Sequence, residues 1–120
     1  MLRTFKAALA ILGVVAAKPV ILTPEGDGQE IGVVWVQGAS CKSESYVKLG
    51  KAFQAAAKAQ GLKAYVGITD FVFDTPEPLL IDKYVDEVTA GLAAAGMQGT
   101  TYYMAAHSLG GVMAQDYAVK

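Results

Sequence analysis

Residues 101–111 read Thr-Tyr-Tyr-Met-Ala-Ala-His-Ser-Leu-Gly-Gly, an apolar run that passes through a serine into two glycines. The run predicts a buried strand, and the apolar positions between residues 112 and 118 have the spacing of a helix. A sharp turn that carries Ser108 therefore joins a strand to a helix. A serine in such a turn has a strained backbone, so the residues two before it and two after it must be small. Ala106 and Gly110 meet this requirement.

Ser108 is therefore a candidate nucleophile. A strand-to-helix turn exposes a serine at the edge of a buried sheet, and the N-terminus of the following helix favours a developing oxyanion. The same five-residue pattern also arises by chance in chains of this size, so its meaning depends on what flanks it. The strand predicted before Ser108 and the helix predicted after it favour the nucleophile.

Strands and helices alternate along the rest of the chain. Residues 31–36 and 62–69 predict strands buried on both faces, and a shorter first strand is expected at residues 20–23. Apolar positions three or four residues apart predict helices over residues 43–60 and 79–95, each followed by a glycine. This order predicts one α/β domain with a doubly wound, mainly parallel sheet and flanking helices. Ligands of such a sheet bind beyond the carboxyl ends of its strands.

The serine motif and an upstream loop together resemble a known family. Residues 106–111, with residues 37–40 (Gln-Gly-Ala-Ser) at the end of an earlier strand, resemble the N-terminal half of the α/β-hydrolase superfamily, of the lipase, esterase or dienelactone hydrolase type. The resemblance implies a partial α/β-hydrolase fold and a serine hydrolase that acts on an ester or related acyl bond. It implies that Ser108 is the nucleophile and that the backbone N–H groups of Leu109 and Ala39 bind the oxyanion. Without the serine motif, residues 37–40 would be interpreted as a plain strand-to-helix turn.

The base and the acid of a catalytic triad are missing from the sequence. In the family both follow the nucleophile, whereas this chain ends at Lys120 within a helical pattern, and a hydrolase sheet normally needs about twice its length. The single histidine, His107, precedes Ser108 and is expected to point away from it. We therefore expect residues 18–120 to be the N-terminal part of an α/β-hydrolase domain, truncated after the helix that follows the serine. The alternative is a non-catalytic, truncated or degenerate hydrolase that at most binds small molecules or a protein.

Residues 1–17 have the features of a secretory signal peptide. Two positive charges precede an apolar stretch at residues 7–17 that ends in small residues. This predicts a secreted or extracytoplasmic protein, and the stretch is too short to cross a bilayer as a helix, so no stable membrane span is expected. The alternative is that residues 5–16 form an apolar helix packed on the domain. The lone Cys41 permits an oxidising compartment without supporting one.

Composition and charge exclude several other partners. The formal net charge is −1 and there is no block of basic residues, so a nucleic acid is not expected. One histidine and one cysteine, far apart, do not make a zinc site of the usual spacing. Gly13, Gly26, Gly28 and Gly32 lack the strand-turn-helix setting of a dinucleotide site, so no cofactor is expected. The expected partner is a small-molecule ester or acyl substrate, whose identity stays open, as does the oligomeric state.

Four other residues are assigned structural roles. Cys41 is an alternative nucleophile, but the sequence shows neither a histidine partner nor clustered basic residues that would activate its thiol. Asp70 and Asp74 lie in residues 70–78, a loop expected to overhang the site, and precede the nucleophile, so they are interpreted as loop or turn residues. Trp35 lies inside a buried strand pattern and is expected in the core.

Overall fold

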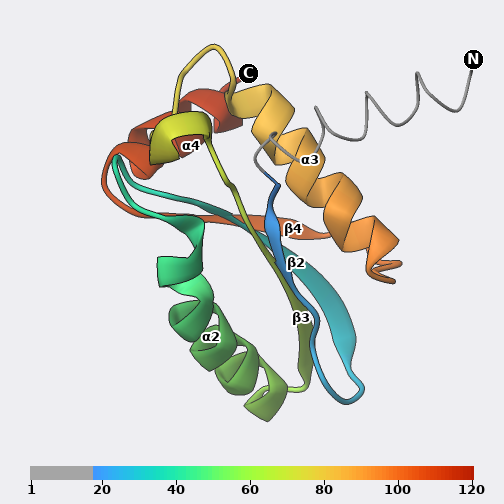
Figure 1. Ribbon diagram of the computed structural model, residues 1–120. Helices are drawn as coiled ribbons and strands as arrows, with labels where there is room; N and C mark the ends of the chain where they lie inside the picture. Colours follow the sequence, from blue (N-terminus) through green and yellow to red (C-terminus); the bar gives the residue numbers. More distant parts are fainter. Residues whose placement is uncertain (1–17) are drawn as a thin grey trace, which may run out of the picture.

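The computed structural model describes residues 18–120, and the chain forms an α/β fold (Figure 1). Both interpretations of residues 1–17, the signal peptide and the packed helix, lie outside the described residues. Within residues 18–120 no helix has both the length and the apolar character needed to cross a bilayer. The elements in chain order are β1 (Val20–Leu22), β2 (Gln29–Val36), η1 (Ser43–Tyr46), α2 (Val47–Ala59), β3 (Leu62–Ile68), η2 (Val72–Asp74), α3 (Ile81–Ala94), β4 (Tyr102–Ala106) and α4 (Leu109–Ala118).

The sheet is mixed, with the strand order β1-β3-β2-β4. β2 pairs in parallel with both β3 and β4, as the alternation of strands and helices predicts. The expectation of parallel pairing is wrong for β1, which pairs antiparallel with β3. The connection from β1 to β2, residues 23–28, is too short for the crossover of roughly a dozen residues that parallel strands need. β1 therefore runs opposite to the other three strands.

The sheet has helices on both faces (Figure 1). Neighbouring residues of β3 show this directly: Val66 lies against Gly50 of α2, whereas Gly67 lies against Val88 of α3. A Cβ atom at Gly67 would lie 2.4 Å from Cγ1 of Val88, so the absence of a side chain lets α3 approach the strand. Successive strand residues point to opposite faces, and both faces are covered, which is why residues 31–36 of β2 and 64–68 of β3 carry no charge.

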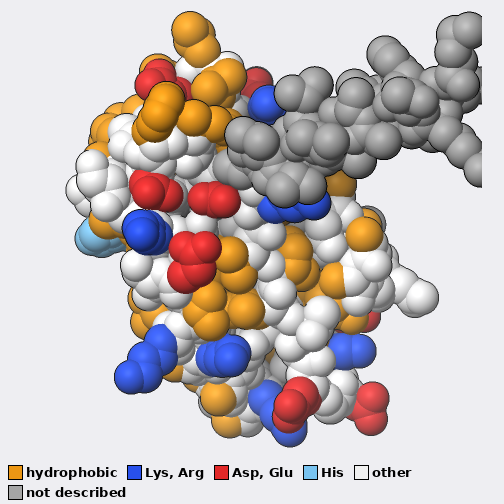
Figure 2. Space-filling model, in the orientation of Figure 1, with side chains coloured by type: hydrophobic (Ala, Val, Ile, Leu, Met, Phe, Trp, Pro, Cys, Tyr) orange, Lys and Arg blue, Asp and Glu red, His pale blue; other side chains and the backbone are white. Residues whose placement is uncertain are grey.

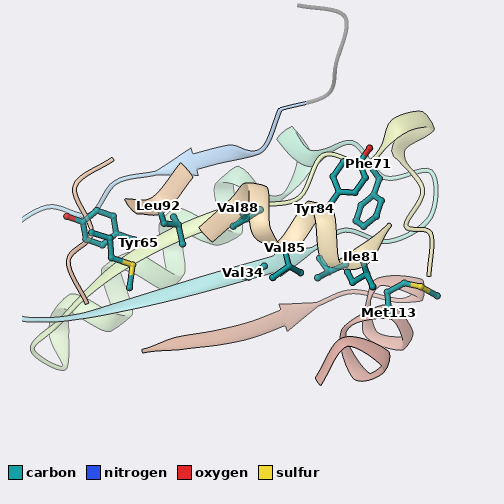
Figure 3. Packing of buried hydrophobic residues seen from close by; sticks show 11 residues of the cluster. Val34, Tyr65, Phe71, Ile81, Tyr84, Val85, Val88, Leu92 and Met113 are labelled. Carbon is teal, nitrogen blue, oxygen red and sulfur yellow. The ribbon is translucent and has the colours of Figure 1, made fainter. Parts of the chain in front are cut away.

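The larger core cluster lies between the sheet and α3. Figure 3 shows the α3 side chains packed over those of β2 and β3, with Phe71 and Met113 at the end that holds α4. Trp35 belongs to the other face, where it is half-buried against the cluster around Tyr46, so the core position predicted for it is only partly attained. The α3-side cluster consists of Val34, Val36, Tyr65, Phe71, Ile81, Tyr84, Val85, Val88, Leu92, Met97 and Met113.

Some large hydrophobic side chains remain on the surface. Figure 2 shows hydrophobic side chains at the end of the molecule that holds η2 and the loop after it. Val72, Phe73 and Leu79 are exposed there. The carboxyl ends of the parallel strands meet at this same end, because the pairing of Val36 with Ala106 puts the ends of β2 and β4 side by side.

Candidate functional site

Ser108 occupies a strained turn between β4 and α4. Its backbone has φ 54° and ψ −124°, a positive φ that residues with side chains rarely adopt. The strand ends at Ala106, the helix begins at Leu109, and the serine side chain is exposed. The conformation matches the sharp strand-to-helix turn that the sequence predicts. Residues 106–110 are called the Ser108 turn below.

The two glycines that follow Ser108 have different roles. A Cβ atom at Gly110 would lie 2.4 Å from the carbonyl oxygens of both Val36 and Gln37, so α4 starts in direct contact with the backbone of β2. A Cβ atom at Gly111 would meet nothing within 4 Å. The requirement for a small residue therefore applies two positions after the serine, and the second glycine is sterically free.

The loop after β2, residues 37–41, lies against the Ser108 turn. It reverses at a turn in which Cys41 N–H donates to Gly38 O (3.3 Å), and Ser40 has φ 56°. A Cβ atom at Gly38 would lie 2.8 Å from Nδ1 of His107. A glycine is therefore needed for the close approach of these two segments. Gly38 and His107 are 69 positions apart in the chain, and the parallel pairing of β2 with β4 brings them together.

The backbone N–H groups of Ala39 and Leu109 have no hydrogen-bond partner among the described residues. The amides on either side of Ala39 are bonded: Gly38 N–H donates to Tyr46 Oη (2.8 Å), and Ser40 N–H donates to Thr75 Oγ1 (3.2 Å). Leu109 N–H is one of the first amides of α4, which have no acceptor within their own helix. Both groups proposed from the sequence as oxyanion donors are therefore without a partner among the described residues, and their role stays a prediction.

Gln37 holds the 37–41 loop in place. Its side chain is fully buried, Nε2 donates to Cys41 O (2.7 Å), and Oε1 accepts from Phe71 N–H (2.9 Å) and from Thr69 Oγ1 (3.3 Å). One amide thus ties the loop after β2 to the loop after β3. In the sequence, Gln37 is only a polar residue that ends an apolar run, and this pattern does not reveal that its side chain is buried.

His107 lies on the α2 side of the sheet. Its Nδ1 is 2.9 Å from Tyr46 Oη, and the two rings are 5.9 Å apart. Burial raises the pKa of the Tyr46 hydroxyl, which therefore keeps its proton. Because Tyr46 Oη accepts from Gly38 N–H, its own proton is available to Nδ1 of a neutral His107. The imidazole is engaged by Tyr46, and no hydrogen bond joins it to Ser108.

The remaining candidates have local roles. Asp70 accepts a hydrogen bond from Ser43 Oγ (2.8 Å) at the start of η1, and Asp74 N–H donates to Phe71 O (2.9 Å). Cys41 Sγ lies 3.4 Å from Ala39 O and forms no disulfide. Asp70 and Asp74 therefore act as loop residues, as their positions in the chain suggest.

A groove of about 630 Å³ opens beside the 37–41 loop on the α2 side. The groove residues are Trp35, Ser40, Cys41, Lys42, Ser45, Tyr46, Leu49, Ala106 and His107.

In the part of the chain that the structure describes, no three His, Cys, Asp or Glu residues are grouped so that they could hold a metal ion.

Comparison of the chain with protein-family models, with curated proteins and with solved structures found no match. The resemblance to α/β-hydrolases therefore rests on the Ser108 turn and on the 37–41 loop. These two segments meet where Gly38 approaches His107, and they carry an exposed serine at a helix N-terminus and two backbone N–H groups without a partner among the described residues.

Proposed function

We propose that Ser108 is the nucleophile of a serine hydrolase with an α/β-hydrolase type of fold, which cleaves an ester or related acyl bond. The observation that carries the proposal is the positive φ of Ser108 at the junction of β4 and α4. Strained residues concentrate at functional sites, where the surrounding structure holds them. The unpartnered N–H groups of Ala39 and Leu109 support the same reaction class, because acyl transfer needs donors for a tetrahedral oxyanion.

The chemistry assigns one role to each group. Ser108 Oγ attacks the acyl carbon and loses its proton to a base, while the carbonyl oxygen becomes an oxyanion that accepts from Leu109 and Ala39. The bond to the leaving alcohol then breaks as the base returns the proton to it, and water releases the acyl group from Ser108 by the reverse steps. His107 is the single histidine of the sequence and is bonded to Tyr46, so we assign neither the base nor its acid to a residue among 18–120.

The second candidate function is binding without catalysis. It is favoured by the lack of any titratable side chain hydrogen-bonded to Ser108 among residues 18–120. In this case the site holds a small apolar molecule and leaves it unchanged. The two candidates differ in whether Ser108 forms a covalent bond when a base is present.

A fluorophosphonate probe separates the two candidates. Without a base, we expect the chain to be labelled very slowly. A positioned base contributes roughly 10²–10⁴-fold, and free 1-methylimidazole supplies part of this, so it should speed labelling by at least about tenfold. Mass spectrometry should place the label on Ser108.

Two variants control the labelling experiment. Ser108→Ala should remove the label, and Cys41→Ser, which removes the nearby thiol, should keep it. Label that persists in Ser108→Ala, or no response to 1-methylimidazole, would show that Ser108 is not a nucleophile. Fast stoichiometric labelling without added base would instead show that a base lies within the chain.

A further inference from the structure

Phe73 is a large apolar side chain held in solvent. It is 92% exposed, and its backbone has φ 59° and ψ 24°, in the left-handed region. Asp74 follows with φ 52°. A bulky residue with positive φ is a genuine outlier, and it persists only where the surrounding structure fixes it. A strained residue that packs against nothing in the fold suggests a ligand as its partner.

The segment around Phe73 is firmly held. Phe71 is buried and stacks on Tyr84 of α3, with ring centroids 4.1 Å apart. Val72 N–H donates to Tyr84 Oη (3.3 Å), and Asp74 N–H donates to Phe71 O (2.9 Å). The exposure of Phe73 is therefore imposed by ordered neighbours on both sides of it.

Two hydrogen bonds join Phe73 to the site. Phe73 O accepts from Thr75 Oγ1 (3.1 Å), and Thr75 Oγ1 accepts from Ser40 N–H (3.2 Å), which is the amide after that of Ala39. Gln37 adds a third link through Phe71 N–H (2.9 Å). The position of Phe73 is thus tied to the loop that carries the proposed oxyanion donor.

The segment that carries Phe73 is apolar, and its charged residues are acidic. Val72 and Leu79 of the same segment are exposed, Leu79 to 94%, and the view in Figure 2 shows hydrophobic side chains collected there. The charged residues between positions 72 and 80 are Asp74 and Glu77, both acidic. Such a surface attracts an alkyl chain and repels a free carboxylate.

We propose that Phe73, with Val72 and Leu79, binds the alkyl chain of a neutral ester, so that the hydrolase prefers long-chain esters to acetyl-sized ones. The inference rests on the proposed function of Ser108 and adds the substrate class. Each methylene that the ligand buries should raise affinity by about fourfold, up to the length that the three side chains cover. The acid product should bind more weakly than the ester, which favours its release.

Alkyl phosphonofluoridates of two lengths test the preference, with 1-methylimidazole as the base. We expect the octyl probe to label Ser108 at least about tenfold faster than the ethyl probe. Phe73→Ala should lower this octyl-to-ethyl ratio by about tenfold. Phe53→Ala, at a partly exposed phenylalanine of α2, is the matched control and should leave the ratio unchanged. An octyl-to-ethyl ratio near one, or a ratio that Phe73→Ala does not alter, would overturn the inference while labelling itself upholds the nucleophile.

A binding measurement separates this inference from the proposed function. Ser108→Ala is titrated with methyl octanoate and with octanoate, followed by nuclear magnetic resonance shifts. Methyl octanoate should bind, octanoate should bind several-fold more weakly, and Phe73→Ala in this background should weaken methyl octanoate by about tenfold. If this pattern holds and Ser108 is never labelled, the apolar site stands and the hydrolase proposal fails. If methyl octanoate does not bind, or binds independently of Phe73, the apolar site is wrong.

Discussion

At both ends of the parallel strands some residues have a positive φ, but the types of residue differ between the two ends. At the amino ends, the residues with positive φ are glycines: Gly26 and Gly28 before β2, Gly61 before β3 and Gly96 before β4. At the carboxyl ends they are residues with side chains: Ser40 after β2, Phe73 and Asp74 after β3, and Ser108 after β4. Glycine adopts positive φ without steric cost, so the strain of the fold is confined to one end.

Backbone amides differ between the same two ends. At the amino end, Glu30 Oε2 accepts from Gln98 N–H and from Gly99 N–H, each at 2.8 Å. At the carboxyl end, the N–H groups of Ala39 and Leu109 have no partner among the described residues. The amino end is built for stability, and the carboxyl end keeps strain and open donors, which is the combination expected where a ligand binds.

The largest expected effect is at Gln37, which holds the carboxyl end together. Gln37→Ala removes three hydrogen bonds from a buried site and leaves a cavity, so we expect the free energy of unfolding to fall by about 4 kcal/mol. Urea unfolding measures the change. The control is Gln60→Ala at an exposed position, with an expected change within about 0.5 kcal/mol. Equal effects at the two positions would show that Gln37 does not organise the strand ends.

Gly110 and Gly111 test the contact between the Ser108 turn and β2. Gly110→Ala places a Cβ atom against two carbonyl oxygens and should lower the free energy of unfolding by about 3 kcal/mol. Gly111→Ala meets no atom within 4 Å and should raise it by about 0.5 kcal/mol, because alanine favours the helix. Thermal or urea unfolding gives both values. A neutral Gly110→Ala would contradict the close approach of α4 to β2.

Substitutions at residues with positive φ should change the free energy of unfolding in opposite directions at the two ends of the strands. Phe73→Gly relieves strain without loss of packing and should stabilise the fold by about 1 kcal/mol, while it removes the proposed ligand contact. Gly61→Ala has open space but φ 77°, so it should destabilise by about 1 kcal/mol. Urea unfolding of the two variants checks both signs. Destabilisation by Phe73→Gly would show that the exposed ring contributes to folding.

The smallest effect concerns pH at the amino end. Hydrogen bonds from the N–H groups of Gln98 and Gly99 lower the pKa of Glu30 from its ordinary value of 4.5. A lowered pKa in the folded state means that the contribution of Glu30 is fully present above about pH 4.5 and is lost as the pH falls through the folded pKa. Unfolding curves between pH 6 and about pH 3 should show this loss, and Glu30→Gln should reduce it. The exposed Glu25→Gln is the control, and an equal response would contradict the role of Glu30.

Much of the fold was predictable because it depends on local patterns. Apolar runs and helical spacing located β2, β3, β4, α2 and α3 to within a few residues, and the order of these elements implied parallel pairing of β2 with its neighbours. The antiparallel direction of β1 did not follow from the alternation of strands and helices, because no helix connects β1 to β2.

The candidate site also has one feature that could be predicted from the sequence and others that could not. The positive φ of Ser108 was predictable, because a serine between a strand and a helix start, with small residues on either side, implies a sharp turn. The roles of Gln37 and Phe73 were not predictable. Their hydrogen bonds and exposure depend on how the loops after β2 and β3 meet.

The sequence by itself therefore determined the alternation of elements and the strained turn at Ser108, since both follow from side-chain periodicity and from steric rules over a few residues. Only the tertiary structure decided which amides stay unpartnered, which polar side chain is buried between the strand ends, and which phenylalanine faces solvent. These properties arise from contacts between segments such as residues 37–41 and 71–75, which are brought together only when β2 and β3 pair.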